Sequence, residues 1–277
     1  EQDNCTVEEW DSLVDQKVPE GTDLVVIAGP RAAFTFPETD ALKAYLAAGG
    51  RTLLLLDIEF APGSGNRMTG LGLDPVLEAY GIRLGDDVVV DPENALPLMG
   101  PETVVVRSFR SHPVTKLLEG LPVVLPLARS VSVAGKAPDG VTAQVLAETS
   151  PEGWGETNLA DLETKVERGA DDLAGPVPLA VAAEAGTERK ARLVVVGDAD
   201  FASSAGIANA ANLYLVSSAV NWLLERESLI SIPPKSTEQV AVTLSRSDIA
   251  RITVFVLLIL PAAAIGLGIA VWFKRRR

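Results

Sequence analysis

Residues 23–57 read DLVVIAGPRAAFTFPETDALKAYLAAGGRTLLLLD, and they predict a strand, a helix and a second strand. The first apolar run, Asp23 to Pro30, stops at Gly-Pro and is typical of a strand buried on both faces. Arg51 to Asp57 has a fully apolar centre and predicts the second strand. Because short connections join the three elements, we expect a right-handed βαβ unit and therefore a parallel sheet.

The helix between these strands is marked at both ends. Pro37-Glu38-Thr39-Asp40 places acids in the first turn, where they interact favourably with the helix dipole. Gly49-Gly50 follows the last turn, as a C-terminal cap does. One face of the helix is apolar and consists of Ala41, Leu42, Tyr45 and Leu46.

Apolar runs further along the chain predict more short elements. A short helix is expected over Asp74 to Tyr80, ending at Gly81. Strands are predicted at Val88 to Val90, Val104 to Val106, Val123 to Leu125 and Val141 to Leu146. Leu179 to Ala183 and Arg192 to Val196 look like paired strands joined by a loop at Gly186.

Two later segments complete the body. Residues 150–175 are polar and rich in turn residues, contain Trp154, and predict a long surface excursion. A helix is expected from about Ala210 to Arg226, with an apolar face formed by Leu213, Val216, Val220, Leu223 and Leu224.

The charge balance excludes one class of partner. The chain has 277 residues, with 37 acidic and 24 basic side chains, for a net charge of −13. Binding to nucleic-acid backbones depends on Lys and Arg neutralising phosphates, so an acidic body of this kind is not expected to bind nucleic acid.

The supply of reactive side chains is also small. Cys5 is the only cysteine and His112 the only histidine, so an intrachain disulfide and a thiolate zinc cluster are excluded. The glycine-rich residues 62–67 match neither a P-loop nor a dinucleotide fingerprint, and they form no nucleophile elbow. We therefore expect no cofactor.

The C-terminal segment is the most apolar part of the chain. Ile252 to Phe273 is an uncharged run of 22 residues, which as a helix would span about 33 Å, close to the ~30 Å core of a bilayer. We therefore expect one C-terminal transmembrane helix in contact with the lipid bilayer. The basic cluster Lys274 to Arg277 is then expected in the cytoplasm, and the acidic body on the extracytoplasmic side of the cytoplasmic (inner) membrane. Tail anchoring, with a cytoplasmic body, is the alternative.

These features predict four parts of the chain. Residues 1–232 would form an extracytoplasmic α/β domain, and residues 233–250 a linker or juxtamembrane strand. Residues 251–273 would form the transmembrane helix, and residues 274–277 a basic cytoplasmic tail. The chain begins with Glu1, and an exported domain needs a signal, so we expect N-terminal sequence to be missing.

Candidate binding residues follow from the predicted strands. In an open parallel sheet, ligands bind outside the carboxyl ends of the strands. That rule selects Pro30, Arg31, Asp57, Asp198 and Asp200. The three aspartates could converge on Mg²⁺ or Ca²⁺, or they could cap loops and the next helix; we favour capping and expect no metal. His112, before Pro113, is a further candidate for binding, as is Asn212; a catalytic base at His112 is not favoured.

The order of elements resembles the GldG family of ABC-transport auxiliary proteins, known from a gliding-motility transporter of bacteria. The resemblance covers almost the whole chain. It is carried by Val26 to Pro30, Leu42, Tyr45-Leu46, Gly49-Gly50, Leu53 to Asp57, Ser111 to Thr115, Pro126 to Ser130, Trp154 with Glu156, Val195 to Phe201, Asn212, Asn221 to Leu223, Ile230 to Lys235, and the final apolar segment with its Arg tail.

The resemblance implies a flavodoxin-like or glutamine-amidotransferase-like α/β domain with a mostly parallel sheet, followed by a transmembrane helix. It also implies a non-catalytic accessory subunit that binds a partner or substrate beside an ABC permease and its ATPase. The enzyme-like fold would then lack a catalytic constellation. The alternative is a membrane-tethered hydrolase or amidotransferase-like enzyme that uses Asp57, Asp198 or a serine such as Ser203. Fold alone does not decide between them.

Overall fold

The strand, helix and strand predicted from residues 23–57 are present in the computed structural model. They are β1 (Val25–Ala28), α1 (Phe36–Ala47) and β2 (Arg51–Leu55). β1 and β2 pair in parallel, with Val25 opposite Thr52, which confirms the predicted pairing. The Thr35 N–H donates to Glu38 Oε2 over 2.8 Å at the start of α1, and Gly49 follows its end with φ +84°. Local capping signals therefore place this helix correctly.

The structure describes residues 5–60, 67–96, 99–159, 167–187, 190–226, 251 and 253–276. The chain divides into two units, Glu1–Pro233 and Pro234–Arg277. The predicted linker 233–250 and most of the glycine-rich residues 62–67 lie outside the described residues.

The remaining elements of the first unit are mostly short strands. Helical segments are α2 (Asp74–Ala79), η1 (Lys116–Leu118), η3 (Asp200–Ala202) and α3 (Asn212–Leu223). The strands are β3 (Ile82–Leu84), β4 (Val88–Val90), β5 (Val104–Val106), β6 (Ser108–Phe109), β7 (Val123–Leu125), β8 (Val131–Val133), β9 (Val141–Glu148), β10 (Trp154–Glu156), β11 (Leu173–Ala174), β12 (Pro178–Ala185) and β13 (Ala191–Val196). All strands and helices predicted for the body from local pattern are thus present within a few residues.

The central sheet is mixed, and the expectation of a mostly parallel, flavodoxin-like or glutamine-amidotransferase-like sheet is wrong. Its strand order is β1-β2-β13-β12-β9-β6. Only the pairs β1–β2 and β2–β13 are parallel, whereas β13–β12, β12–β9 and β9–β6 are antiparallel. Just five residues separate β12 from β13, which is too short for a parallel crossover, so these strands must form a hairpin. The paired strands around Gly186 were predicted correctly, but their consequence for the sheet was not.

Smaller antiparallel sheets accompany the central one in the described chain. They have the orders β11-β10-β4, β3-β8 and β5-β7. The segment 150–175, expected to be a surface excursion, contributes β10 to the first of these. Trp154 and Glu156 are buried there. The Trp154 Nε1–H donates to Glu156 Oε2 over 3.3 Å, which gives the buried carboxylate a hydrogen-bond partner.

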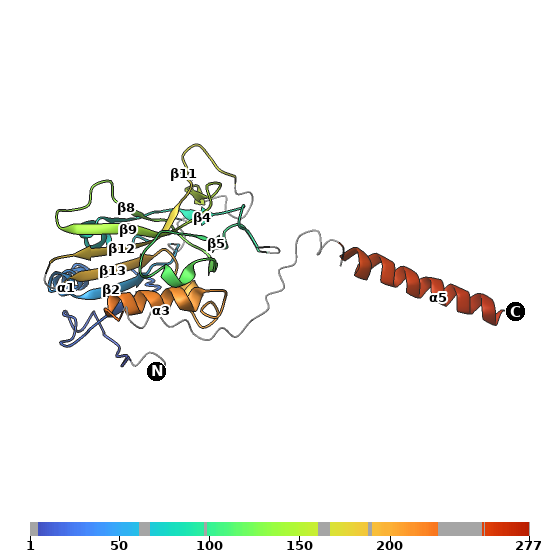
Figure 1. The fold of residues 1–277 in the computed structure, drawn as a ribbon, viewed down its shortest axis with the longest axis horizontal. Helices are drawn as coiled ribbons and strands as arrows, with labels where there is room; N and C mark the ends of the chain where they lie inside the picture. The colour runs from blue at the N-terminus through green and yellow to red at the C-terminus, as the bar shows by residue number, and fades with distance from the viewer. Residues whose placement is uncertain are drawn as a thin grey trace. The chain divides into compact units, whose positions relative to one another are not determined.

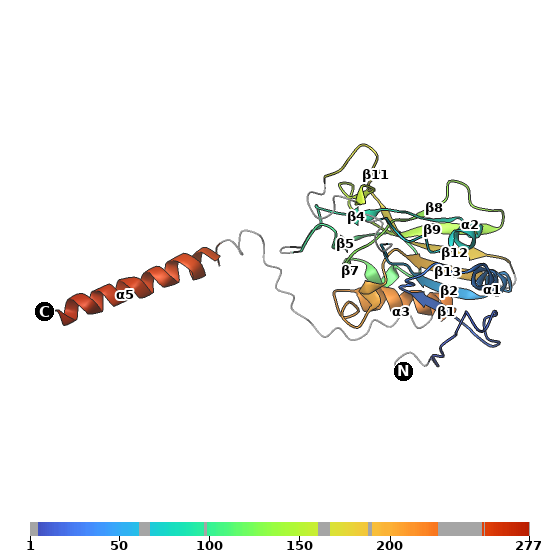
Figure 2. The ribbon, with the colours of Figure 1, turned by 180° about the vertical axis from the view of Figure 1, so that it is seen from behind.

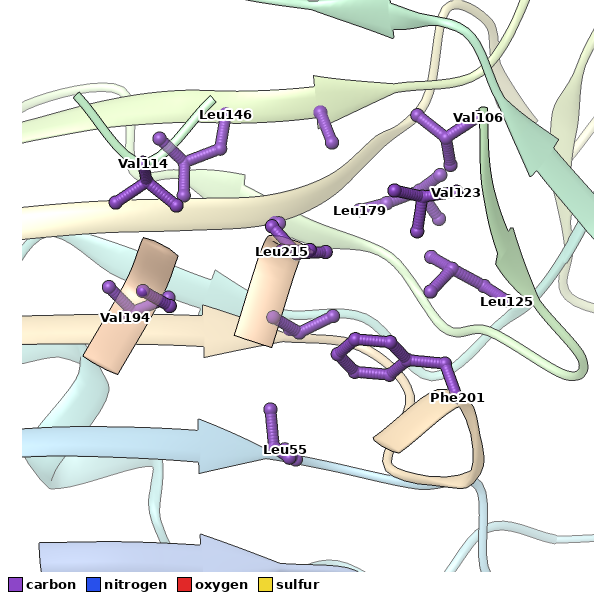
Figure 3. Close-up of a cluster of buried hydrophobic side chains, with 14 of the residues drawn as sticks. Leu55, Val106, Val114, Val123, Leu125, Leu146, Leu179, Val194, Phe201 and Leu215 are labelled. Atoms are coloured by element: carbon purple, nitrogen blue, oxygen red, sulfur yellow. The ribbon is translucent and has the colours of Figure 1, made fainter. Parts of the chain in front are cut away.

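Helices cover both faces of the central sheet, so that two hydrophobic cores form. Leu53 and Leu55 of β2 face the core that contains Leu215 and Trp222 of α3. Leu54 of the same strand faces the second core, which includes apolar side chains of α1 and α2. Figure 1 shows α3 running beside β2 and β13, and Figure 3 shows Phe201, Leu55 and Leu215 within the first core. Because successive side chains of a strand point to opposite faces of the sheet, β2 contributes residues to both cores.

Two expectations about burial are wrong. β1 is the edge strand of the sheet, visible beside β2 in Figure 2, and Val26 is 53% exposed rather than buried. In α3, Leu213 is 50% exposed, whereas Leu223 of the predicted face is buried and Val216 and Val220 pack against the first core. The predicted face is therefore wrong at Leu213, and the buried face also includes Asn212, Leu215 and Trp222.

The second unit differs from the predicted transmembrane helix. Its described residues form a π-helical turn, η5 (Phe255–Ile259), followed by α5 (Leu260–Arg275), an α-helix of 16 residues. Within the described residues, no helix combines the length and apolar character that crossing a membrane requires. The expectation of a C-terminal transmembrane helix is corrected accordingly.

Candidate functional site

The carboxyl ends of the three parallel strands surround a cleft of about 410 Å³. Backbone and side chains from the segments after β1, β2 and β13 form most of its wall, which contains several carboxylates. The lining residues are Ala28, Gly29, Arg31, Asp57, Ile58, Glu59, Leu127, Ala199, Asp200, Ala202 and Ser203. The cleft therefore lies where ligands are expected to bind in a parallel sheet, at the carboxyl ends of its strands. Of the predicted residues, Arg31, Asp57 and Asp200 line it.

Asp57 lies just beyond the end of β2 and is half-buried. Its Oδ1 accepts a hydrogen bond from the Ala199 N–H. Burial raises the pKa of the Asp57 carboxyl, the Ala199 hydrogen bond opposes that rise, and the negative charge of Asp200 adds to it. The side chain therefore joins the segment after β2 to the segment after β13.

Asp198 lies behind the cleft wall and is fully buried. Its Oδ1 accepts from the Phe201 N–H over 3.3 Å, which closes the turn into η3. Its Oδ2 is buried and has no hydrogen-bond partner among the described residues. Burial, followed by the nearby charge of Asp57, raises the pKa of Asp198 to about 7. The Asp198 carboxyl is therefore protonated in a large fraction of molecules near neutral pH.

The pKa of Asp198 predicts how stability depends on pH. Because the folded chain holds this proton up to about pH 7 and the unfolded chain releases it near pH 4, stability should fall as pH rises through that window. Asp198→Asn cannot ionise, so we expect it to be more stable than the wild type by about 1–3 kcal/mol at pH 8. Urea unfolding from pH 4 to pH 8 measures this. The difference between variant and wild type should grow up to pH 7 and then stay constant; a difference independent of pH would contradict the assignment.

Gly29, the residue after β1, lies close to the Asp57 side chain. Gly29 has φ +58°, and a Cβ placed on it would lie 3.1 Å from Asp57 Oδ2. Its N–H donates to the Leu55 carbonyl over 2.9 Å, which continues the parallel pairing beyond the strand. Pro30 follows it but does not line the cleft. The Gly-Pro signal therefore marks a backbone that approaches Asp57 closely, while Pro30 has no direct place in the site.

Arg129 is a structural residue of the site that the sequence did not single out. Its side chain is 3% exposed, and its Nε donates to the Gly85 carbonyl over 2.7 Å. Its Nη2 lies 2.7 Å from Asp86 Oδ1, and its Nη1 lies 3.5 Å from the Asp57 carbonyl. Burial lowers the pKa of Arg129, while the charge of Asp86 raises it. No local pattern signals a buried arginine, because its partners are distant in sequence.

His112 lies at the opposite end of the sheet. Its ring contacts Trp222 edge-on, with ring centroids 4.9 Å apart, and Trp222 in turn lies under the Arg192 guanidinium. Arg192 is near the amino end of β13, whereas Asp198 follows the carboxyl end, and the strand between them spans about 20 Å. The structure therefore does not bring His112 to the other candidates.

Asn212 lies at the start of α3 and is fully buried. Its Oδ1 accepts from the Val124 N–H and its Nδ2 donates to the Val124 carbonyl, both over 2.9 Å. The same amide nitrogen lies 3.0 Å from the Gly206 carbonyl. All these partners are backbone groups, so Asn212 ties α3 to β7 and does not line the cleft.

The described wall of the cleft includes the hydroxyl of Ser203, which the enzyme alternative would use. Its Oγ donates to the Asp200 carbonyl over 2.7 Å and accepts from the Gly206 N–H over 3.1 Å. Because His112 lies at the other end of β13, the two are not placed as nucleophile and base. In the described part of the chain, no three His, Cys, Asp or Glu side chains are placed to hold a metal ion together.

Comparisons with known proteins place the chain in a family. No curated protein matches it significantly. The solved mmIFT52 N-terminal domain matches 74% of this chain and 78% of its own length, with 21% sequence identity and a TM-score of 0.53, a likeness of fold alone. A putative ThuA-like protein from Bacteroides uniformis matches 73% of this chain and 69% of its own length, with 18% identity and a TM-score of 0.39. Over residues 2–216, the chain matches and therefore belongs to the family described as ABC-type uncharacterized transport system, auxiliary type.

Proposed function

We propose that this protein is a non-catalytic accessory subunit of an ABC-type transport complex, and that it binds a partner or the transported substrate through the acidic cleft. The observation that carries the proposal is the family match over residues 2–216. The cleft supports it, because it is the concavity that the fold places at the carboxyl ends of β1, β2 and β13. The gliding-motility type within this family stays a prediction.

The side chains of the cleft favour binding over catalysis. They supply carboxylates and one guanidinium, but the only histidine of the chain contacts Trp222 at the opposite end of β13. The Ser203 hydroxyl is engaged with the backbone of η3 and the following turn. Charged groups at the rim of a cleft support recognition and orientation of a ligand without a covalent step.

The expected partners are an ABC permease and its ATPase. The glycine-rich residues 62–67 do not match a Walker sequence, so ATP hydrolysis would be carried out by another subunit. The extracytoplasmic location of the body at the cytoplasmic membrane stays a prediction.

Co-purification from native membranes in mild detergent tests the accessory role. Full-length tagged protein is compared with Asp57→Asn/Asp200→Asn, which removes two charges from the cleft, and with Asp40→Asn, an exposed acid on α1. We expect permease and ATPase with the wild type and with Asp40→Asn, and at least a tenfold lower yield with the cleft variant, about 1.4 kcal/mol of binding. Recovery of the protein alone in all three cases would contradict the accessory role.

A further inference from the structure

The charge of the cleft is unbalanced. Among the lining residues that the structure describes, Asp57, Glu59 and Asp200 contribute three carboxyl groups, whereas Arg31 is the only cation. Arg31 is 88% exposed at its side chain, and its Nε lies 3.7 Å from Glu59 Oε1. An exposed pair of this kind is weak, so its guanidinium can be displaced at little cost. The rim of the cleft thus already holds a guanidinium beside a carboxylate.

A buried carboxyl behind the wall adds an independent observation. Asp198 is fully buried, its Oδ2 has no hydrogen-bond partner among the described residues, and the charge that acts on it most strongly is that of Asp57. Buried carboxylates normally have their oxygens paired. The charges that act on Asp198 are those of Asp57 and Asp200, and both are negative. A positive charge in the cleft would therefore favour ionisation of the Asp198 carboxyl.

The groups around this pair of aspartates account for its electrostatics. Asp200 and Glu59 act on Asp57 from the cleft side, and both are negative. Arg31 is at the rim. Arg129 lies below, with its Nη1 3.5 Å from the Asp57 carbonyl, but its guanidinium is already bound to Gly85 and Asp86. Burial and the negative charge of Asp57 disfavour ionisation of the Asp198 carboxyl, which therefore keeps its proton near neutral pH.

We propose that the cleft binds the ammonium or guanidinium group of an organic cation, which displaces Arg31 from Glu59. The arriving positive charge favours the ionised form of the Asp57 and Asp198 carboxyls, so we expect the O–H bond of the Asp198 carboxyl to break on binding and its proton to pass to solvent. No oxidation or covalent bond to the ligand is involved. The proposal rests on the proposed function only in taking the cleft as the recognition surface.

An organic cation suits this geometry better than a metal ion. The described residues contain no group of three side chains placed to hold a metal. An ammonium or guanidinium carries several N–H donors, which can reach carboxylates spread over the segments after β2 and β13. Arg31 lines the same cleft, and its guanidinium lies beside the Glu59 carboxylate at the rim.

Calorimetric titration of the full chain with agmatine, which has one ammonium and one guanidinium group, tests the proposal. Titrations at pH 7 in phosphate and in Tris, whose ionisation heats differ, report any proton released. We expect saturable binding with release of up to one proton. Asp57→Asn and Asp200→Asn should each weaken binding about tenfold, roughly 1.4 kcal/mol, whereas the exposed Asp40→Asn should not. Asp198→Asn should bind agmatine with no proton release.

Arg31→Ala provides the sharpest control, because it removes the competing positive charge from the cleft and leaves all three carboxylate side chains in place. We expect it to bind agmatine several-fold more tightly than the wild type. A peptide with blocked termini and one central arginine is titrated in a second experiment. Binding of agmatine but not of the peptide would indicate a free amine as ligand. Binding of the peptide would indicate an arginine side chain of a partner protein. Thermal unfolding of each variant establishes that it is folded.

Absence of saturable binding for both probes would overturn the proposal, as would equal binding by the wild type and by folded Asp57→Asn and Asp200→Asn. Heats that are identical in the two buffers would overturn the released proton. The accessory role is judged separately: permease and ATPase that co-purify with a protein unable to bind either probe would reject the cation and retain the subunit.

Discussion

Gly197→Ala should reduce the free energy of unfolding by more than about 4 kcal/mol, the range reached when a substitution forces backbone apart in a core. A Cβ on Gly197 would lie 1.9 Å from the carbonyl oxygen of Arg129, which is a backbone atom and cannot rotate away. The Gly197 N–H donates to the Leu179 carbonyl over 3.0 Å, and its own carbonyl accepts from the Arg129 N–H over 2.8 Å. Relieving the clash would break these bonds.

Gly135→Ala is the matched control, because a Cβ there would meet nothing within 4 Å. Urea unfolding of both variants measures the difference, and we expect the control to stay within about 0.5 kcal/mol of the wild type. A Gly197→Ala protein as stable as the control would show that Arg129 and Gly197 are not packed as described. Since Asp198 directly follows Gly197, a surviving variant would also alter the cleft.

Asn212→Asp is expected to have the second large effect, a loss of about 3–5 kcal/mol at pH 8, the range found when a buried charge is left without a partner. The substitution changes no more than the amide nitrogen. In the wild type that nitrogen donates to the carbonyls of Val124, Phe201 and Gly206. A carboxylate oxygen in its place would face these three acceptors and provide no donor.

Asn209→Asp is the same chemical change three residues earlier, at an exposed side chain whose amide lies 3.4 Å from the Ala205 carbonyl. We expect that variant to lose less than about 1 kcal/mol. Equal losses at the two positions would contradict the structural role of Asn212. Because protonation removes the buried charge, the deficit of Asn212→Asp should also shrink as pH falls towards 4.

The candidate site was predictable in part, because strand ends can be recognised locally. Asp57 and Asp200 were selected as residues that follow apolar runs, and the structure places both on the cleft. Arg129 reaches the same region from a segment whose local pattern carries no strand-end signal. His112 and Asn212 belong to the stretches that carry the family resemblance, and the structure places them in contacts with Trp222 and with the backbone of β7. Whether the cleft residues bind a ligand stays a prediction.

The sequence by itself determined the elements near residues 23–57 and the charge of the body. Capping at Glu38 and Gly49 acts over a few residues, so its result can be read locally. Tertiary structure alone decided the order of the sheet, because β12 pairs with β9 and β13 through contacts distant along the chain. It also decided that Asp198 is buried beside Asp57, since the two follow adjacent parallel strands, and electrostatic coupling depends on distance in space.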